Sequence, residues 1–220
     1  MIELSTLSKI YKIAGQEIKA VQKVNLTVDD GEFMSIAGHS GSGKSTLLSL
    51  MGCLTRPDMG SVLIDGEDIW SRNDYELSKL RNEKIGFVYQ FPSLIPTLTA
   101  AENVFLPTVF GKKRSIGDAV KLLELVGLYD KTERYPSELS SGEQQRVAIA
   151  RAFINSPKFI LADEPTGNID EETESEIMAF FERMNKGENT TIIMATHDVN
   201  LLPHATRKFR MKNGILYGIS

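Results

Sequence analysis

The run GHSGSGKST, Gly38 to Thr46, contains the residue types best suited to chemistry. It fits the pattern G-x-x-x-x-G-K-[ST], in which glycines let the backbone curl so that successive N–H groups point at phosphate oxygens. The helix that follows adds partial positive charge at its N-terminus. Lys44 would reach the β- and γ-phosphates of a nucleotide, and the Ser45 hydroxyl would coordinate Mg²⁺. We expect the whole run to line the phosphates: Gly38, His39, Ser40, Gly41, Ser42, Gly43, Lys44, Ser45 and Thr46.

The segment FILADE, Phe159 to Glu164, is an apolar strand that ends in two carboxylates. In a parallel sheet flanked by helices, the C-terminal ends of the strands face the ligand crevice. Asp163 is therefore placed to orient the Mg²⁺ shell, and Glu164 to polarise an attacking water as general base. The apolar strand argues against a merely solvated acidic turn. The reaction stays open at this point, because kinases, GTPases and motors share the glycine-rich loop.

Further residues resemble the motifs of one family, the ATP-binding cassette (ABC) ATPases. The run LSSGE, Leu139 to Glu143, followed by Gln144-Gln145-Arg146 and a helical run over Val147 to Ile154, resembles the ABC signature motif. Single residues resemble other ABC landmarks in the expected order: Tyr11 the aromatic that stacks on adenine, Gln90 the Q-loop glutamine, Asp170 the D-loop aspartate and His197 the switch histidine. For Tyr11, an ordinary edge-strand aromatic is the alternative interpretation.

The resemblance implies an ATPase that uses ATP and Mg²⁺, with Glu164, His197 and Lys44 as catalytic residues. It implies Ser45, Gln90 and Asp163 as Mg²⁺ ligands. It also implies a head-to-tail dimer, formed with a second copy or with a paralogue. In the sequence itself, the signature residues open a helix and so predict a second anion-binding nest. In the family, such a nest covers the nucleotide of the partner chain. The residues acting across the dimer would be Ser140, Ser141, Gly142, Glu143 and Asp170.

Three positions depart from the family pattern. Ser141 stands where glycine is usual, and Glu143 replaces the usual glutamine and brings a carboxylate to the dimer interface. We expect both to be tolerated, with slower hydrolysis. His39 replaces a common proline; we expect its side chain to point away from the phosphates without a catalytic role. Because Glu164 and His197 are both present, the site does not resemble a degenerate one.

The runs Gly86 to Gln90, Leu94 to Ala100 and Glu164 to Asp170 resemble the lipoprotein-release and macrolide-export (LolD/MacB) branch of ABC ATPases. The resemblance implies a subunit that drives an exporter, or transmits force across a membrane, through integral membrane permease subunits. These would dock near Gln90 to Pro107, on apolar residues of that segment. Packing of these residues within the chain is an equal alternative. The location implied is the cytoplasmic face of the inner membrane.

Two rival functions remain open in the sequence. A regulatory ABC ATPase of the cell-division type would have much the same sequence, and its membrane partner would distinguish it. Soluble translation or repair ABC proteins usually carry two cassettes or a long coiled-coil insertion, and neither is visible in this chain. The sequence does not name the transported substrate, because membrane subunits usually select it in this family.

The elements that must position these residues follow a strand–helix alternation. Val24 to Val28 and Phe33 to Ala37 read as strands, and a helix is expected from about Lys44 to near Gly52. Later elements are also expected: strands at Ser61 to Ile64, Ile85 to Tyr89, Phe159 to Ala162 and Thr191 to Ala195, mostly helix from Phe91 to Tyr135, a helix with Ile177, Phe180, Phe181 and Met184 on one face, and a hairpin at Asn213-Gly214.

This order predicts an α/β P-loop fold with a mainly parallel core sheet and a helical insert. The family resemblance adds an antiparallel β subdomain. We expect a single domain over 1–220, with residues 1–89 and about 158–220 forming the nucleotide-binding core. Residues from about 90 to 157 would hold the Q-loop, the helical subdomain and the signature motif.

The bulk composition limits the possible partners. The formal net charge of −4 argues against broad binding of the nucleic-acid backbone, so we expect no nucleic-acid partner. No signal peptide and no apolar run of bilayer length is visible, so another chain would supply any pore. We expect the single cysteine, Cys53, to be buried and His204 to lie at the surface. We expect Trp70 in the core and Lys112-Lys113-Arg114 on a solvated face.

Overall fold

The computed structural model describes residues 1–13, 15–111, 114–167 and 169–219. Its strands are β1 (Ile2–Ile13), β2 (Gln16–Val28), β3 (Phe33–Ala37), β4 (Met59–Ile64), β5 (Glu67–Asp68), β6 (Ile85–Val88), β7 (Phe159–Asp163), β8 (Thr191–Thr196), β9 (Arg207–Lys212) and β10 (Ile215–Ile219). Its α-helices are α1 (Lys44–Met51), α2 (Asp74–Lys84), α3 (Ala100–Phe105), α4 (Ile116–Leu125), α5 (Ser141–Phe153) and α6 (Glu171–Glu188). Short 3₁₀ helices are η1 (Ile69–Ser71), η2 (Leu106–Phe110), η3 (Tyr129–Lys131), η4 (Pro136–Glu138) and η5 (Val199–His204).

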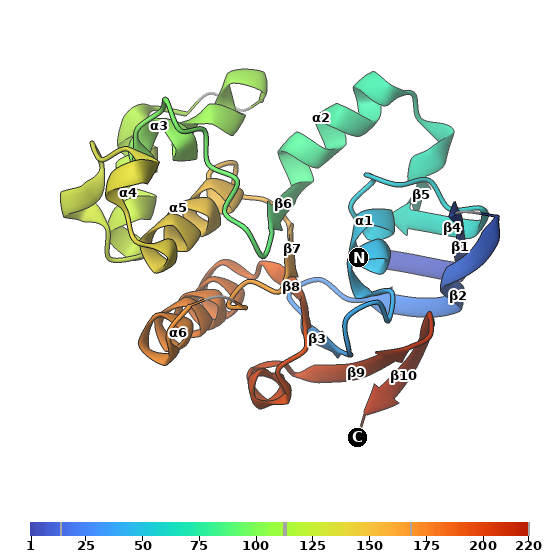
Figure 1. The fold of residues 1–220 in the computed structure, drawn as a ribbon. Helices are drawn as coiled ribbons and strands as arrows, with labels where there is room; N and C mark the ends of the chain where they lie inside the picture. The colour runs from blue at the N-terminus through green and yellow to red at the C-terminus, as the bar shows by residue number, and fades with distance from the viewer. Residues whose placement is uncertain (14, 112–113, 168, 220) are drawn as a thin grey trace.

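The core sheet has the strand order β10-β9-β3-β8-β7-β6 and is parallel except at β10, which pairs antiparallel with β9. Helix α1 lies on one side of this sheet, and α5 and α6 lie on the other (Figure 1). Both faces of β7 are therefore buried: Phe159 and Leu161 pack into the core that contains α1, while Ile160 and Ala162 pack into the core that contains α5 and α6. Such two-sided burial explains the uninterrupted apolar run that the sequence shows.

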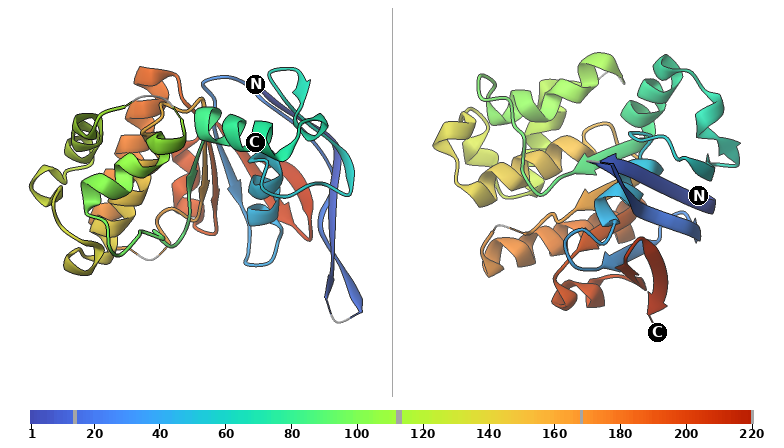
Figure 2. Two further views of the ribbon diagram at one scale, coloured as in Figure 1. Left: turned by 90° about the horizontal axis from the view of Figure 1, so that it is seen from above. Right: turned by 45° about the vertical axis from the view of Figure 1, so that its right-hand side comes forward.

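A second, antiparallel sheet has the order β2-β1-β4-β5. The sequence predicts only short strands here, but β1 has 12 residues and β2 has 13, and the two form a hairpin that projects from the body of the molecule (Figure 2). Their register shifts between Leu4 and Ile10, where the strands change from the buried base to the exposed tip. The mainly parallel core and the antiparallel sheet confirm the expected fold class.

The expectation of helix from Phe91 onward is wrong for residues 91–99, which form no helix. Pro92 and Pro96 interrupt this stretch, because proline lacks the N–H that a helix interior requires. The fully buried Asn103 holds the loop instead. Its Oδ1 accepts from the N–H of Ile95 at 2.7 Å, and its Nδ2 donates to the carbonyls of Ile95 and Leu98.

Helix α2 is missing from the sequence-based expectations, although its start carries a readable signal. Asn73 caps the helix, accepting from the N–H of Glu76, whose carboxylate accepts in turn from the N–H of Asn73. This reciprocal capping box marks helix starts in sequences. The charged composition of Asp74–Lys84 hides the helix, because only Leu77 and Leu80 are buried.

Several smaller predictions are confirmed. Cys53 is 2% exposed, and Ile177, Phe180 and Phe181 on α6 are buried. Asn213 and Gly214 join β9 to β10 with positive φ angles of 49° and 77°, as a tight hairpin turn requires. The expectation for Trp70 is met only in part, because this side chain packs against the core but is partly buried. His204 is partly exposed and contacts Glu182. Lys112 and Lys113 lie outside the described residues. In the described part of the chain, no helix is both long and apolar enough to cross a bilayer.

Candidate functional site

The phosphate loop joins β3 to α1 at the edge of a pocket of ≈ 950 Å³. Gly43 precedes the helix with φ 108°, and a Cβ at this position would stand 2.0 Å from the carbonyl oxygen of Ala20. Only glycine fits such a left-handed, closely packed position. The junction therefore turns sharply enough to leave the first N–H groups of α1 without helical partners, and these are the groups that bind anions.

Lys44 extends its ammonium group back across the loop. The side chain is 6% exposed, and its Nζ donates to the carbonyl of Gly38 at 2.7 Å and lies 3.2 Å from Oε1 of Glu164. A buried ammonium needs such partners, because desolvation of an unpaired charge is costly. The geometry brings the loop lysine and the carboxylate after β7 into one ion pair.

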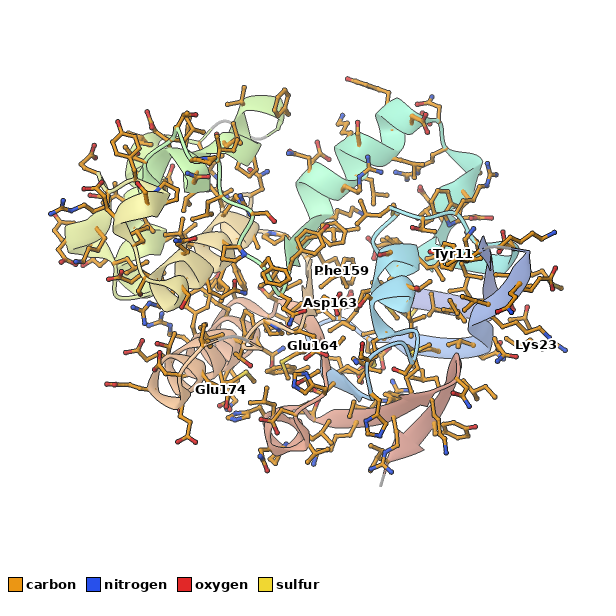
Figure 3. The ribbon with its side chains drawn as sticks, viewed as in Figure 1. Tyr11, Lys23, Phe159, Asp163, Glu164 and Glu174 are labelled. Carbon is orange, nitrogen blue, oxygen red and sulfur yellow. The ribbon has the colours of Figure 1, made fainter. Side chains whose placement is uncertain are left out.

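Glu164 and His197 leave neighbouring strands of the core sheet, β7 and β8, and meet beyond their ends. The Oε2 atom of Glu164 accepts from the His197 N–H at 3.0 Å and lies 2.7 Å from Nδ1 of the ring. The Glu164 backbone has a φ of 51°, an unusual value for a residue with a Cβ. Figure 3 shows Asp163 and Glu164 together at the centre of the molecule, between α1 and the helical side.

Asp163 lies beside Ser45 and provides an unpartnered oxygen. Burial raises the pKa of the Asp163 carboxyl, although a hydrogen bond from Ser45 opposes this effect. Its Oδ1 atom is buried and has no hydrogen-bond partner among the described residues. The described residues contain no cluster of three or more metal-binding side chains. A hydroxyl with one carboxylate is the donor set that suits Mg²⁺ bound together with phosphate and water, so these residues fit that ion.

Tyr11 and Gln90 also line the pocket, as do all the predicted loop residues except Gly38, which lies beside it in the same loop. Tyr11 stands opposite Ile18 on the β1–β2 hairpin and is 36% exposed. At this point β1 pairs only with β2, so Tyr11 lies on an open strand edge, where it lines the pocket. His39 is exposed, and its carbonyl is 3.4 Å from the Lys44 Nζ.

The signature residues do not line this pocket. They form the start of α5, where Ser140 and Glu143 make a capping box: the Ser140 N–H donates to Glu143 Oε2 at 2.7 Å, and the Glu143 N–H donates to Ser140 Oγ at 3.2 Å. Ser141 is exposed, while Gly142 is buried. A Cβ added at Gly142 would lie only 3.0 Å from the side chain of Thr173. Asp170 caps α6 through the Thr173 N–H. One chain thus carries two separate candidate anion-binding places.

Some pocket residues were missed by sequence reasoning. The hairpin and the β9–β10 turn form part of the pocket wall beside the loop, through Glu17, Ile18, Lys19, Ala20, Gln22, Asn213 and Gly214. Only the Asn213-Gly214 turn had a sequence signal, and nothing in its local sequence places it beside the loop. The Gly214 N–H donates to the Ser42 carbonyl at 2.9 Å, which fixes the turn there.

Comparisons with known proteins agree with the motifs. A family model described as ABC transporter matches residues 21–167. The chain is 46% identical to the lipoprotein-releasing system ATP-binding protein LolD 1 of Chlorobium chlorochromatii, covering 88% of this chain and 80% of that protein. It is 42% identical to the macrolide export ATP-binding/permease protein MacB of Rhodopirellula baltica, over 98% of this chain and 32% of that protein.

A solved structure is similar over nearly its whole length. The dimeric post-hydrolysis state of the ATP-binding cassette MJ0796 of Methanocaldococcus jannaschii, bound to ADP and Pi, superposes with a TM-score of 0.93. It is 41% identical and covers 100% of this chain and 99% of that one.

Proposed function

The chain belongs to the ABC transporter family as an ATP-binding, ATP-hydrolysing subunit similar to the LolD and MacB ATPases, and from this premise we propose that it works as a homodimer coupled to membrane permease subunits. The observation that carries the proposal is the contact of Lys44, Glu164 and His197 at the edge of a pocket lined by the phosphate loop. In that arrangement, a single site contains both the groups that bind phosphate and a general base for the attacking water.

In the proposed reaction, the backbone of the loop and Lys44 hold the β- and γ-phosphates, and Tyr11 stacks on the adenine. Ser45 and Asp163, with Gln90, would hold Mg²⁺, which supplies charge neutralisation at the phosphates. Glu164 takes the proton of the attacking water. His197, in contact with Glu164, fixes the orientation of that carboxylate.

The dimer is proposed because the two candidate anion-binding sites of one chain, the phosphate loop and the start of α5, do not line the same pocket. In the head-to-tail arrangement, Ser140, Ser141, Gly142 and Glu143 of one chain, with Asp170, cover the nucleotide held by the loop of the other. Binding ATP then brings the chains together, and hydrolysis releases them. We treat residues 1–89 and about 158–220 as the nucleotide-binding core, and about 90–157 as the helical unit that carries the signature motif.

We place the docking surface for the permease at a groove of ≈ 360 Å³ lined by residues of α2, the loop after β6 and the start of η2. Leu54 and Tyr89 line it and are 46% and 43% exposed, and Pro107 also lines it. Phe91 lies next in the chain and is 67% exposed. Exposed apolar side chains around a groove are typical of protein-binding surfaces. Docking there would hold the chain at the cytoplasmic face of the membrane.

Glu164→Gln tests the proposed function. The amide cannot accept the proton of water, so we expect turnover to fall by about 10²-fold or more while ATP binding is kept. Gel filtration with Mg-ATP should show a dimer for this variant and a monomer without nucleotide. Lys44→Ala is the matched control, because it should lose ATP binding and the dimer together. Hydrolysis at the wild-type rate in Glu164→Gln, or a monomer at saturating Mg-ATP, would contradict the proposal.

A further inference from the structure

Gln145, in α5, connects three segments that are far apart in the sequence. Its Nε2 donates to the backbone oxygen of Tyr89 at 2.9 Å and to that of Pro165 at 2.9 Å. Tyr89 immediately precedes Gln90, and Pro165 immediately follows Glu164. The side chain of Gln145 is 2% exposed, so water does not compete for these hydrogen bonds.

The amide carries an energetic penalty that an apolar side chain would avoid. The Oε1 atom of Gln145 is buried and accepts no hydrogen bond from any described residue. An unsatisfied buried acceptor destabilises a fold, whereas a methionine of similar size would leave no such atom. The two donated hydrogen bonds are therefore what this side chain contributes, and both end beside residues of the candidate site.

A second side chain of α5 strengthens the same connection. The guanidinium of Arg151 donates to the backbone oxygens of Pro92 at 2.7 Å and Ser93 at 3.0 Å. Gln145 holds the residue before Gln90, and Arg151 holds the residues shortly after it. The loop that contains Gln90 is thus fixed to α5 on both sides. Gln90 lies between these two points of attachment. Its Nε2 atom is 3.3 Å from the position that a Cβ of Gly167 would occupy, and Gly167 belongs to the loop that follows Glu164.

We propose that Gln145 is a positioning residue that couples the signature end of α5 to Gln90 and Glu164 of the same chain. Gly142 lies three residues before Gln145, about one helical turn away. A displacement of the start of α5 therefore moves Gln145, and through its two hydrogen bonds it moves the backbone next to Gln90 and the backbone next to Glu164. A positional change of about 1 Å in a catalytic group is enough to change a rate by about 10²-fold.

The consequence rests on the proposed dimer. In that dimer the signature residues of one chain contact the nucleotide bound by the other, while Glu164 and Gln90 act on the nucleotide bound by their own chain. Gln145 then links the two nucleotide sites, so that filling one site aligns the base of the second. Because the two chains of the proposed homodimer are identical, each site acts on the other in the same way, and the dependence of hydrolysis on ATP concentration becomes sigmoidal.

The experiment compares Gln145→Met with Gln144→Met. Gln144 is the neighbouring residue of α5, and its Nε2 also donates to two backbone oxygens, those of Pro136 and Leu139, but to neither segment of the catalytic site. Both variants lose two hydrogen bonds and keep the length of the side chain. ATP affinity is measured with a fluorescent ATP analogue, and hydrolysis is measured as a function of ATP concentration in the full-length chain.

For Gln145→Met we expect an analogue affinity within about 2-fold of wild type, a kcat lower by about 10-fold or more, and a Hill coefficient that falls toward one. For Gln144→Met we expect the Hill coefficient to stay at the wild-type value, because its hydrogen bonds end at Pro136 and Leu139 and reach the segment of neither Gln90 nor Glu164. Should Gln145→Met fail to fold, Gln145→Asn keeps the amide but is one methylene shorter, and it is expected to lower the Hill coefficient as well.

Equal kinetics and equal Hill coefficients in the Gln145 and Gln144 variants would overturn the inference while leaving the proposed function intact. A wild-type chain that hydrolyses ATP without any cooperativity would also overturn it. Failure of the proposed function is a different result, since it would appear in Glu164→Gln as the absence of an ATP-dependent dimer, whatever the Gln145 variants do.

Discussion

Glu164 shows how a single residue is prepared for its proposed role. Its backbone has a φ of 51°, and such left-handed geometry in a residue with a Cβ stores strain of about 1–3 kcal/mol. The backbone is held there because the Glu164 N–H donates to the carbonyl of Ala195 at 2.9 Å. The turn directs the carboxylate toward Lys44 and His197 instead of along β7. Strain at this position is thus accompanied by a fixed orientation of the proposed base.

Glu143 is one of the positions that depart from the family pattern, and its effect on the proposed dimer can be predicted. A hydrogen bond from the Ser140 N–H lowers the pKa of the Glu143 carboxyl, and Lys131 Nζ lies 3.9 Å away, so the carboxylate is charged and partly compensated. Glutamine also completes a capping box, so Glu143→Gln changes only the charge. We expect the ATP-dependent dimer to become about 2–10-fold tighter, because in the proposed dimer each chain then loses one negative charge near the partner's phosphates.

Lys131→Met supplies the opposite change and serves as the control. Loss of its ammonium removes one of the cationic groups that offset the Glu143 charge, so the dimer should become weaker by a similar factor. Both variants are measured by analytical ultracentrifugation in the Glu164→Gln background with Mg-ATP. A change in the same direction for both would show that charge at this position does not govern closure.

At the residue scale, the sequence predicted much of the site, because its motifs are local. The phosphate loop, Glu164 and His197 line one pocket, and Asp163 lies beside Ser45 of that loop. Each of them stands within a short run that has its own pattern. Gln145 could not be predicted. It stands beside another glutamine of the same type, and only the packing of α5 against the loop after β6 makes one of them fully buried and the other not.

At the scale of elements, the join between β3 and α1 sets a strict requirement. Replacing Gly43 with alanine places a Cβ 2.0 Å from the Ala20 carbonyl, so β2 and the phosphate loop must separate. We expect Gly43→Ala to abolish ATP binding and to lower the melting temperature by more than about 4 °C.

Gly66→Ala is the matched control, since Gly66 also has a left-handed φ, 81°, but no atom within 4 Å of a Cβ. It isolates the conformational cost of about 1 kcal/mol, or about 2–4 °C in a chain of this size. Thermal unfolding and ATP titration of both variants check the pair. Equal losses would mean that contact with Ala20 is unimportant.

Elements were predictable where burial on both faces produces a continuous apolar run, as in β3, β7 and β8. Prediction failed where the decisive contact comes from a distant part of the chain. Residues 91–99 are held by Asn103 and not by a helical repeat, and α2 lies mostly in solvent, so its sequence lacks an apolar face. Strand order depends on the same distant contacts. In the core sheet, β3 lies between β9 and β8, an arrangement that no local pattern encodes.

At the scale of the whole molecule, the nucleotide pocket and the proposed docking groove lie on either side of the loop after β6. Gln90 lines the pocket, and Tyr89 lines the groove. Neighbouring residues of one loop therefore line the nucleotide pocket and the proposed docking groove for the membrane partner. Movement of this loop is a direct route by which ATP binding could reach a permease.

Leu54→Glu tests the docking surface. A carboxylate on the groove wall would have to be desolvated by an apolar partner helix, so we expect co-purification with membrane proteins from detergent extracts to fall by about 10-fold or more. The ATP-dependent dimer should persist, because Leu54 lies outside the nucleotide pocket. Tyr75→Glu, at a site that is 77% exposed on α2 and outside the groove lining, is the control. Undiminished co-purification of Leu54→Glu would contradict the placement.

The burial of Cys53 has a practical consequence for observing these movements. Desolvation raises the pKa of this thiol to about 12, so at neutral pH it carries almost no thiolate, the form that reacts with maleimides. Because the chain has one cysteine, the native protein is a nearly silent background for thiol labelling. A fluorophore attached to a new surface cysteine would report its own position alone. The approach and separation of two subunits could then be followed in real time by energy transfer, without removing any native residue.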